Sequence, residues 1–358
     1  MNDSAATTLL HGDNIMGPHV LLLPFPGMQG HANPMLQLGH RLAFHGLHPT
    51  LVVSRHVLST TTSNSCPFPM VTISDGFDAG GIASCADTAE YVCRMVAVGS
   101  ETLARLVHAE ARAGRPVRVL VCDSHLPWAR RVARHAGVAA AAFMTQMCAM
   151  DVVYGEVWAG RVALPLADGS VLRGRLGVEL GPHDVPPFMA APQWYPAFTE
   201  SVLSQFDGLE HADDVLVNSF RELEPMEADY LESTWPAKTI GPTLPSLYLD
   251  DGRLPFNKAY GFNLFSSTAA PCIAWLDSKE PCSVVLASYG TVANLDMVQL
   301  EELANGLCDS GKPFIWVLRS NEEEKFSEEL CSKCKERGLI VPFCPQLEIL
   351  AHKATGMR

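Results

Sequence analysis

Residues 19–46 read HVLLLPFPGMQGHANPMLQLGHRLAFHG, and this stretch decides the fold. Residues 20–23 are all apolar, which is typical of a strand covered on both faces of a sheet. Pro24 and Pro26 end the strand, because proline has no N–H to donate to a neighbouring strand. A strand buried on both faces predicts a parallel sheet with helices on either side.

The residues after this strand predict a loop and then a helix. Asn33 suits an N-cap, Pro34 suits the first helical position, and Gly46 ends the helix. His31 is then expected in the loop between the carboxyl end of the strand and the helix. Ligands bind at that edge of open α/β sheets, so His31 is the first candidate for a catalytic residue.

The composition indicates a globular chain of two domains without a polyanionic partner. The 358 residues are 47% hydrophobic and 18% charged, and this length suits two packed domains. The net charge of −13 argues against nucleic acid or an anionic membrane as a partner. No Lys or Arg precedes Arg41, and no apolar run suits a signal peptide or a membrane span. A soluble, cytoplasmic protein with reduced cysteines is expected.

Alternating strand and helix patterns predict an α/β fold with doubly wound domains. Residues 1–16 are expected to form a flexible tail, 17–241 the first domain, 242–271 a linker, and 272–358 the second domain. Residues 322–337 predict one charged helix. The second domain has too few strands and helices for a sheet as large as the first, so it is expected to be incomplete.

His31 and Asp123 form the strongest pair of chemical candidates. Asp123 follows a second apolar strand, residues 117–121, and is expected at the same sheet edge as His31. A histidine in a cleft serves as a general base when another group holds its second nitrogen, and a buried carboxylate needs such a partner. Taken singly, each residue has an ordinary explanation, as a surface histidine or as a helix cap.

The sequence disfavours NAD binding, a P-loop, a serine hydrolase and a zinc site. Gly27 and Gly30 do not form G-x-G-x-x-G, and the second strand ends in Ser54 and Arg55 without an acidic ribose ligand, which argues against NAD binding. The chain has neither a P-loop nor the G-x-S-x-G elbow of a serine hydrolase. Residues 331–334 have the C-x-x-C spacing of a zinc site, but no second pair follows.

The second domain offers a turn that is rich in hydroxyls. Residues 288–291, Ser-Tyr-Gly-Thr, follow a strand and suit diphosphate oxygens, although such residues also form ordinary turns. Phe343 and Gln346 are similarly read either as ligand contacts or as a core aromatic residue and a surface amide.

Seven runs of residues together resemble the plant-type UDP-dependent glycosyltransferases over nearly the whole chain. The runs are FPGMQGHANP (25–34), CDSHLPWA (122–129), FMTQ (143–146), NSFRELE (218–224), IGP (240–242), CIAWLDSKEPCSVVLASYGT (272–291) and FCPQLEILAHKATG (343–356). The last run is similar to the first part of that family's donor-binding signature. The resemblance implies the GT-B architecture, with two Rossmann-like domains of which the second is incomplete.

The resemblance also implies an activity and roles for individual residues. It implies transfer of a sugar, glucose first, from a UDP-sugar co-substrate to a hydroxyl or carboxyl group of a phenolic, flavonoid or carboxylic acid acceptor. It further implies an inverting displacement by a monomer that needs no metal or other cofactor. His31 is implied as the catalytic base and Asp123 as its partner. The residues implied on the donor side are Ser288, Thr291, Phe343, Cys344 and Gln346. The residues implied on the acceptor side are Met28, Gln29, Phe143, Thr145 and Gln146.

Two departures from the family pattern have consequences. The family has Trp at the position of Phe343, and Phe offers less area to stack on uracil. The donor signature also continues beyond the position of Gly356, whereas this sequence ends at Arg358. The alternative expectation is therefore an inactive fragment or pseudoenzyme, which binds the acceptor but does not turn over UDP-sugar.

Overall fold

The structure, a computed structural model, describes residues 17–61, 66–181, 183–249, 257, 269–290, 295–323 and 325–357. The chain divides into two compact units, Met1–Phe262 and Asn263–Arg358. Each unit is built on a parallel sheet with helices, so the α/β class predicted from the sequence is confirmed. The tail expected at residues 1–16 lies outside the described residues.

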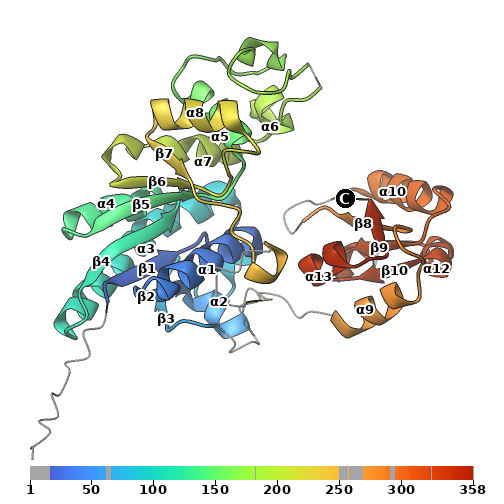
Figure 1. Cartoon of the computed structure of the whole chain (residues 1–358), viewed down its shortest axis with the longest axis horizontal. Helices are drawn as coiled ribbons and strands as arrows, with labels where there is room; N and C mark the ends of the chain where they lie inside the picture. Colours follow the sequence, from blue (N-terminus) through green and yellow to red (C-terminus); the bar gives the residue numbers. More distant parts are fainter. Residues whose placement is uncertain are drawn as a thin grey trace, which may run out of the picture. The chain divides into compact units, whose positions relative to one another are not determined.

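The first unit contains a parallel sheet of seven strands (Figure 1). The strands are β1 (His19–Leu23), β2 (His48–Ser54), β3 (Met70–Ile73), β4 (Val117–Asp123), β5 (Ala139–Met144), β6 (Asp214–Val217) and β7 (Ala237–Thr239). Their spatial order is β3-β2-β1-β4-β5-β6-β7, so the chain reverses direction across the sheet between β1 and β4. These two strands pair Leu23 with Cys122 near their carboxyl ends. Ligands bind at such a switch point in open α/β sheets.

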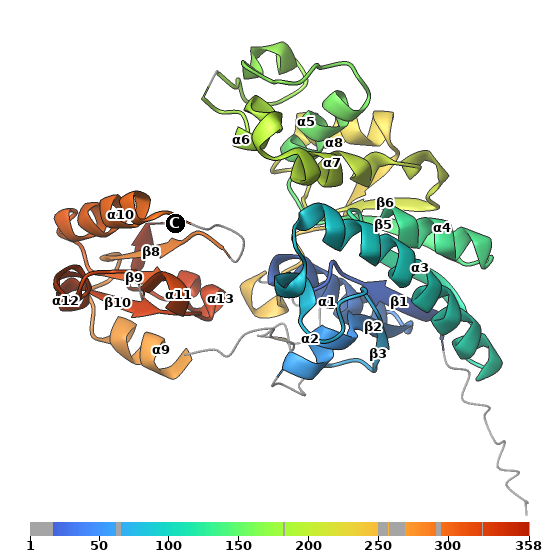
Figure 2. The ribbon, with the colours of Figure 1, turned by 180° about the vertical axis from the view of Figure 1, so that it is seen from behind.

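Helices cover both faces of this sheet, as the wholly apolar first strand predicts. The helices are α1 (Gln29–Phe44), α2 (Arg55–Thr60), α3 (Thr88–Arg112), α4 (Pro127–His135), α5 (Cys148–Trp158), α6 (Pro187–Ala190), α7 (Pro196–Leu203) and α8 (Pro225–Thr234). Helix α1 lies over one face, and α3 and α4 lie over the other (Figures 1 and 2). Within the described ranges, no helix combines the length and apolar character needed to cross a membrane.

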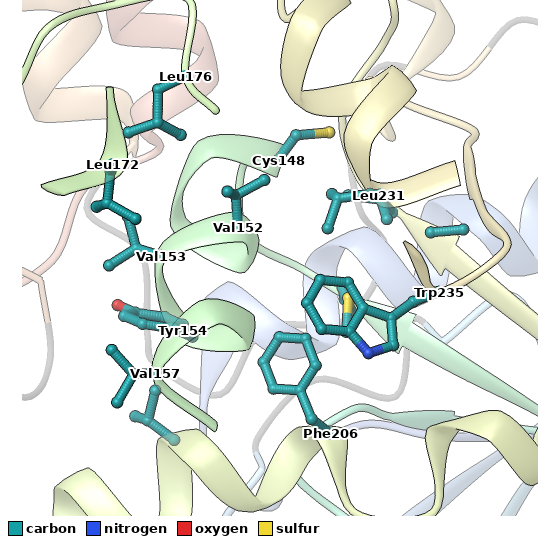
Figure 3. Close-up of a cluster of buried hydrophobic side chains, with 14 of the residues drawn as sticks. Cys148, Val152, Val153, Tyr154, Val157, Leu172, Leu176, Phe206, Leu231 and Trp235 are labelled. Carbon is teal, nitrogen blue, oxygen red and sulfur yellow. The ribbon is translucent and has the colours of Figure 1, made fainter. Parts of the chain in front are cut away.

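A large hydrophobic cluster joins α5, α7 and α8 to β6 (Figure 3). Trp235 lies against Gly155 of α5, where a Cβ would approach the indole ring to 2.2 Å. Val152 and Leu231 are buried in the same cluster. Because α5 follows β5 after a short turn, this packing also fixes the turn that contains Thr145.

The start of α1 differs from the sequence prediction. The helix begins at Gln29 with Met28 as its N-cap residue, so Asn33 and Pro34 lie inside it. Pro34 lies past the first turn, so it costs the helix one backbone hydrogen bond. The amide of Gln29 donates to the Asn33 side chain, which does not cap the helix. The prediction of a loop around His31 is consequently wrong, because His31 lies in the first turn of α1.

The second unit has a parallel sheet with the order β10-β9-β8-β11 among its described residues. Its strands are β8 (Val284–Ser288), β9 (Phe314–Val317), β10 (Gly338–Val341) and β11 (Thr355–Met357), and its helices are α9 (Ala269–Asp277), α10 (Met297–Asp309), α11 (Ser320–Glu323), α12 (Glu328–Arg337) and α13 (Gln346–Ala351). The single helix predicted over residues 322–337 is wrong. Phe326 packs on Trp316 with ring centroids 5.4 Å apart, and Ser327 caps a new helix, α12.

Residues 242–271, expected to be the linker, are described only in part. Thr243 continues the first unit, because its N–H and hydroxyl both donate to Asn218 Oδ1, at 2.9 and 2.7 Å. Helix α9 begins at Ala269. The division between the two units follows Phe262, within the range expected for the linker.

Candidate active site

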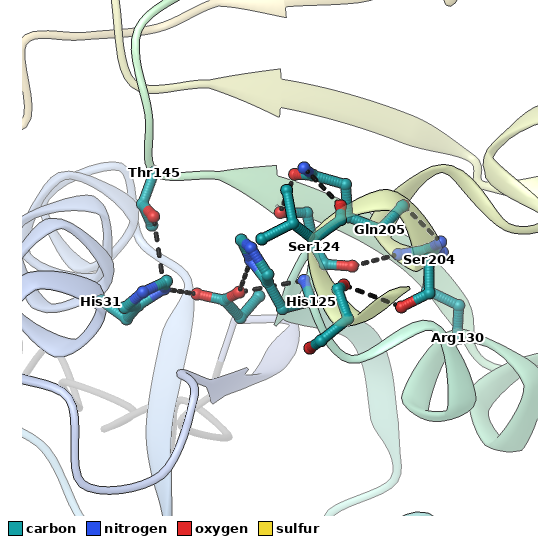
Figure 4. A network of polar contacts seen from close by, with 10 residues as sticks. His31, Ser124, His125, Arg130, Thr145, Ser204 and Gln205 are labelled. Atoms are coloured by element: carbon teal, nitrogen blue, oxygen red, sulfur yellow. Dashed lines mark hydrogen bonds and ion pairs between the residues drawn. The ribbon is translucent and has the colours of Figure 1, made fainter. Parts of the chain in front are cut away.

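The carboxyl ends of β1 and β4 bring His31 and Asp123 into contact. After β1 the chain passes through Gly27, at a φ of 71°, and enters the first turn of α1, where the His31 N–H donates to Met28 O at 3.1 Å. Asp123 is the last residue of β4 and is fully buried. Its Oδ2 lies 2.6 Å from His31 Nδ1 (Figure 4). The two residues selected from the sequence therefore meet across the switch point.

This contact sets the protonation of both groups. The carboxylate can only accept, so His31 Nδ1 donates and Nε2 is the nitrogen left to take up a proton. Burial lowers the pKa of His31, but the charge and hydrogen bond of Asp123 outweigh burial and leave that pKa raised. Burial raises the pKa of Asp123, but His31 and His125 hold it well below its ordinary value. The His31 side chain is 22% exposed, so this nitrogen base is accessible while its partner is not.

His125 is a third member of the site, and the sequence reasoning missed it. Its backbone N–H and its Nδ1 lie 3.0 and 3.1 Å from Asp123 Oδ1, and both donate to it. Its ring stands edge-on to the His31 ring, with centroids 5.4 Å apart. An available signal was its position two residues after an Asp at a strand end, because Asp side chains bond the backbone two residues on. Each histidine thus binds one oxygen of Asp123.

A buried polar network supports the turn after β4 (Figure 4). Arg130 of α4 donates to the carbonyl oxygens of Ser124, Gln205 and Asp207, at 3.3, 3.1 and 2.8 Å. The Ser124 hydroxyl donates to Gln205 Oε1 at 3.1 Å. The bonds to the carbonyl oxygens of Ser124 and Gln205 are buried, so breaking either one leaves a desolvated polar group, and the network resists movement for this reason. The turn that contains Asp123 is therefore held in place by the fold.

Two of the residues expected on the acceptor side follow β5. Thr145 Oγ1 lies 3.3 Å from His31 Nδ1, so Thr145 contacts the His31 imidazole directly. Gln146 comes next in the chain, and its buried Oε1 has no hydrogen-bond partner among the described residues. The turn after β5 thus contributes one contact to His31 and one hydrogen-bond acceptor atom that has no partner among the described residues.

The other three residues expected on the acceptor side differ in burial. Met28 is half-buried at the N-cap of α1. Gln29 is only 7% exposed, and its amide is engaged with Asn33. Phe143 is fully buried in β5, opposite Asp123 of β4. Of these three, Met28 is the most accessible.

The residues expected on the donor side gather around a cavity of about 200 Å³ in the second unit. Ser288, Phe343, Cys344 and Gln346 line this cavity at the carboxyl ends of β8 and β10. Gln346 Nε2 donates to Ser288 Oγ at 3.2 Å. Thr291, the fifth expected residue, lies outside the described residues.

Cys344 and Phe343 contribute to the cavity in different ways. Cys344 is 1% exposed and belongs to the hydrophobic cluster around Ile349. Burial, with a smaller effect of Cys272, raises the pKa of its thiol to about 12, so the sulfur stays protonated and apolar. Phe343 is half-buried on the cavity wall. Phe343 therefore offers a ring surface, whereas Cys344 mainly supports the wall.

One group of side chains in the described part of the chain has the spacing of a metal site. Its ligand atoms lie within 4.8 Å of one another, and its members are His31, Asp123 and His125. The cysteine pair at residues 331–334 belongs to no such group within the described ranges. Cys334 is buried instead, with its Sγ 3.7 Å from Cys308 Sγ.

Comparison with known proteins adds relatives of high similarity. The chain is 62% identical over 358 residues to a UDP-glucosyltransferase of Hordeum vulgare subsp. vulgare, covering 99% of this chain and 75% of that relative. The crystal structure of Os79 from O. sativa in complex with UDP is 66% identical with a TM-score of 0.89, covering 94% of this chain and 76% of the other. A crystal structure of Os79 with a trichothecene is 64% identical with a TM-score of 0.86, covering 94% and 75%. No protein-family model matches the chain.

Proposed function

Because the chain belongs to the plant UDP-dependent glycosyltransferase family, we propose that it transfers glucose from UDP-glucose to a small acceptor molecule. The 2.6 Å contact between His31 and Asp123 carries this proposal. It supplies a base at the switch point of the first unit, where a ligand is expected. The cavity lined by Ser288 and Phe343 supplies a candidate donor surface in the second unit.

The proposed reaction is a single displacement that inverts the anomeric carbon. The acceptor hydroxyl gives its proton to His31 Nε2 while its oxygen bonds to the anomeric carbon. The bond between that carbon and the UDP oxygen breaks, and UDP leaves. Asp123 stabilises the resulting imidazolium, because the attraction between opposite charges is stronger in a buried site than in water.

The proposed acceptor is a small molecule with a neutral hydroxyl group. A neutral hydroxyl needs a base to remove its proton, and the buried Asp123 beside His31 serves that purpose. Os79, at 64% identity, was crystallised with a trichothecene, which makes this class the first to test. Phenols and flavonoids follow, and carboxylic acids come last because an ionised carboxylate has no proton to lose.

The proposed co-substrate is a UDP-sugar, with no resident metal or organic cofactor. The groups on the cavity wall that suit it are the Ser288 hydroxyl, the Gln346 amide and the Phe343 ring. A hydroxyl and an amide both donate to phosphate oxygens, and an aromatic ring stacks on a base.

The test is transfer of radiolabelled glucose from UDP-glucose to a trichothecene, a flavonol, a simple phenol and a phenolic acid. Two proteins are assayed, the 358-residue chain and the same chain extended by the last quarter of Os79, because the chain covers about three quarters of its relatives. Labelled glucoside from either protein supports the proposal. Acceptor binding without transfer in both proteins would favour the acceptor-binding alternative, and binding of none of the four compounds would refute the acceptor site.

A further inference from the structure

His31, Asp123 and His125 bring two imidazole nitrogens and one carboxylate together at the switch point. Their ligand atoms lie within 4.8 Å of one another. We propose that this triad is an inhibitory binding site for a divalent transition-metal ion such as Zn²⁺. Two imidazoles and one carboxylate form a common ligand set for such ions. The ion would be an inhibitor of the base and not a cofactor of the reaction.

The ligand atoms of the triad lie close enough together to converge on a single zinc ion. Asp123 Oδ2 lies 2.6 Å from His31 Nδ1, and Asp123 Oδ1 lies 3.1 Å from His125 Nδ1. Zinc binds nitrogen and oxygen ligands at about 2.0–2.2 Å, which places tetrahedral ligands about 3.4 Å apart. An ion between the two rings therefore needs the ligand atoms to move by roughly 1 Å or less.

Groups other than the three ligand side chains hold this geometry. The backbone N–H of His125 holds Asp123 Oδ1 at 3.0 Å, and this bond is independent of the imidazole that would bind the ion. Arg130 and its three carbonyl partners fix the turn between these residues. Groups that orient metal ligands in this way raise metal affinity, and removing such a group typically lowers the affinity by about 10- to 100-fold.

The triad also leaves one coordination position open. His31 is 22% exposed, whereas the side chains of His125 and Asp123 are 9% and 0% exposed, so solvent reaches the ligand set from the His31 side. Thr145 Oγ1, 3.3 Å from His31 Nδ1, is the neighbouring polar group there. Three protein ligands with an open fourth position characterise zinc sites that exchange water or other small ligands.

Zinc at this site would disable the proposed base through its tautomer, and this consequence rests on the proposed function. In the absence of metal, His31 carries its proton on Nδ1 and takes up the acceptor's proton at Nε2. If zinc binds Nδ1, the neutral ring carries its proton on Nε2 and has no free nitrogen. The Asp123 carboxylate would coordinate the same ion, so its charge would no longer stabilise the imidazolium. Both effects reduce transfer without any change in the fold.

Binding is tested first, on the 358-residue chain, by calorimetric titration with zinc chloride. We expect one site, weakened at least about tenfold in His125→Phe and in His31→Gln, which change ligands on different elements. His108→Phe, at an exposed histidine of α3, is the matched control and should bind as the wild type does. Circular dichroism verifies that each variant is folded.

Cobalt(II) distinguishes this site from the eleven cysteines of the chain. Cobalt bound by the triad gives only visible absorption bands. Cobalt bound by cysteine also gives a near-ultraviolet band, which comes from charge transfer between the thiolate and the metal. Spectra of the triad type that disappear in His125→Phe support the proposal. Equal zinc affinity in the wild type and both ligand variants, or a thiolate spectrum alone, would overturn it.

Inhibition is tested separately, in whichever protein transfers glucose. We expect zinc to lower wild-type transfer at least tenfold more than it lowers the residual transfer of His125→Phe, each compared with its own zinc-free rate. If no protein transfers glucose, the proposed function fails while the titrations still decide the metal site. If zinc binds the triad and transfer is unaffected, the inhibitory role is wrong.

Discussion

The polar groups at the strand ends of the two units are held differently. In the first unit, Asp123 is fully buried and accepts hydrogen bonds from both His31 and His125. In the second unit, Ser288 and Gln346 share one exposed hydrogen bond beside the cavity. Charge-assisted bonds in a buried site are strong, whereas an exposed bond between neutral groups competes with water. The fold of the first unit therefore holds the side chains of its site in fixed positions. In the described part of the second unit, one exposed hydrogen bond fixes the polar side chains less firmly.

Removing the base should have the largest effect. We expect His31→Ala, in a protein that transfers glucose, to reduce kcat for a neutral hydroxyl acceptor by roughly 10²–10⁴ with little change in Tm. An ionised carboxylate acceptor should lose less, because it has no proton to give. The control is His135→Ala, at an exposed histidine of α4. Equal kcat for wild type and His31→Ala on a phenol would contradict the role of the base.

Asp123→Asn should cause a similar loss by a different route. Asp123 raises the pKa of His31 and burial lowers it, so without the carboxylate only the lowering effect remains. The base must be neutral to accept a proton, so the acidic limb of kcat/KM should lie above about pH 6.5 in the wild type and move to lower pH in the variant. The loss should not add to that of His31→Ala, because the pair acts as a unit. Additive losses with an unmoved limb would mean that Asp123 is only structural.

Arg130→Met examines whether the first site owes its rigidity to the network behind it. The change removes the donor from three carbonyl groups, two of them buried, which should reduce the free energy of unfolding by about 2–4 kcal/mol. Urea unfolding, followed by tryptophan fluorescence, measures the loss. Arg134→Met, at an exposed arginine of the same helix, should change the free energy of unfolding by less than about 0.5 kcal/mol. Similar midpoints for both variants would show that the network is not a main support.

The sequence predicted the parts of the site that local pattern determines. Apolar runs located β1 and β4, and His31, which follows β1 in the first turn of α1, does meet Asp123 at the end of β4. The predicted start of α1 is wrong because Asn33 and Pro34 locally favour the beginning of a helix. The helix in the structure begins earlier, at Gln29, and tolerates the backbone hydrogen bond that Pro34 cannot make. Local preference is weak where tertiary packing favours another conformation.

Other features depend on contacts between distant residues and have no local pattern. Arg130 bonds to Gln205 and Asp207, more than seventy positions away, and nothing around Arg130 in the sequence indicates this. The break between α11 and α12 arises because Phe326 packs on Trp316 of β9. His125 lies between these two cases. Its position two residues after Asp123 can be seen in the sequence, but the direction in which its ring points cannot.

The smallest effect should come from Phe343→Trp, which tests the cavity wall of the second unit. If Phe343 stacks on the uracil base from the cavity wall, a larger ring should strengthen UDP binding by about 0.5–1 kcal/mol, or roughly two- to fivefold. Calorimetric titration of the extended chain with UDP measures this gain, and inorganic pyrophosphate, which has no base, should bind both proteins equally. Tighter binding of both ligands would mean that the change acts on the phosphate side, and weaker UDP binding would mean that the cavity has no room for an indole. Only the second result would show that the wall of the second unit is tightly constrained, as the switch point of the first is.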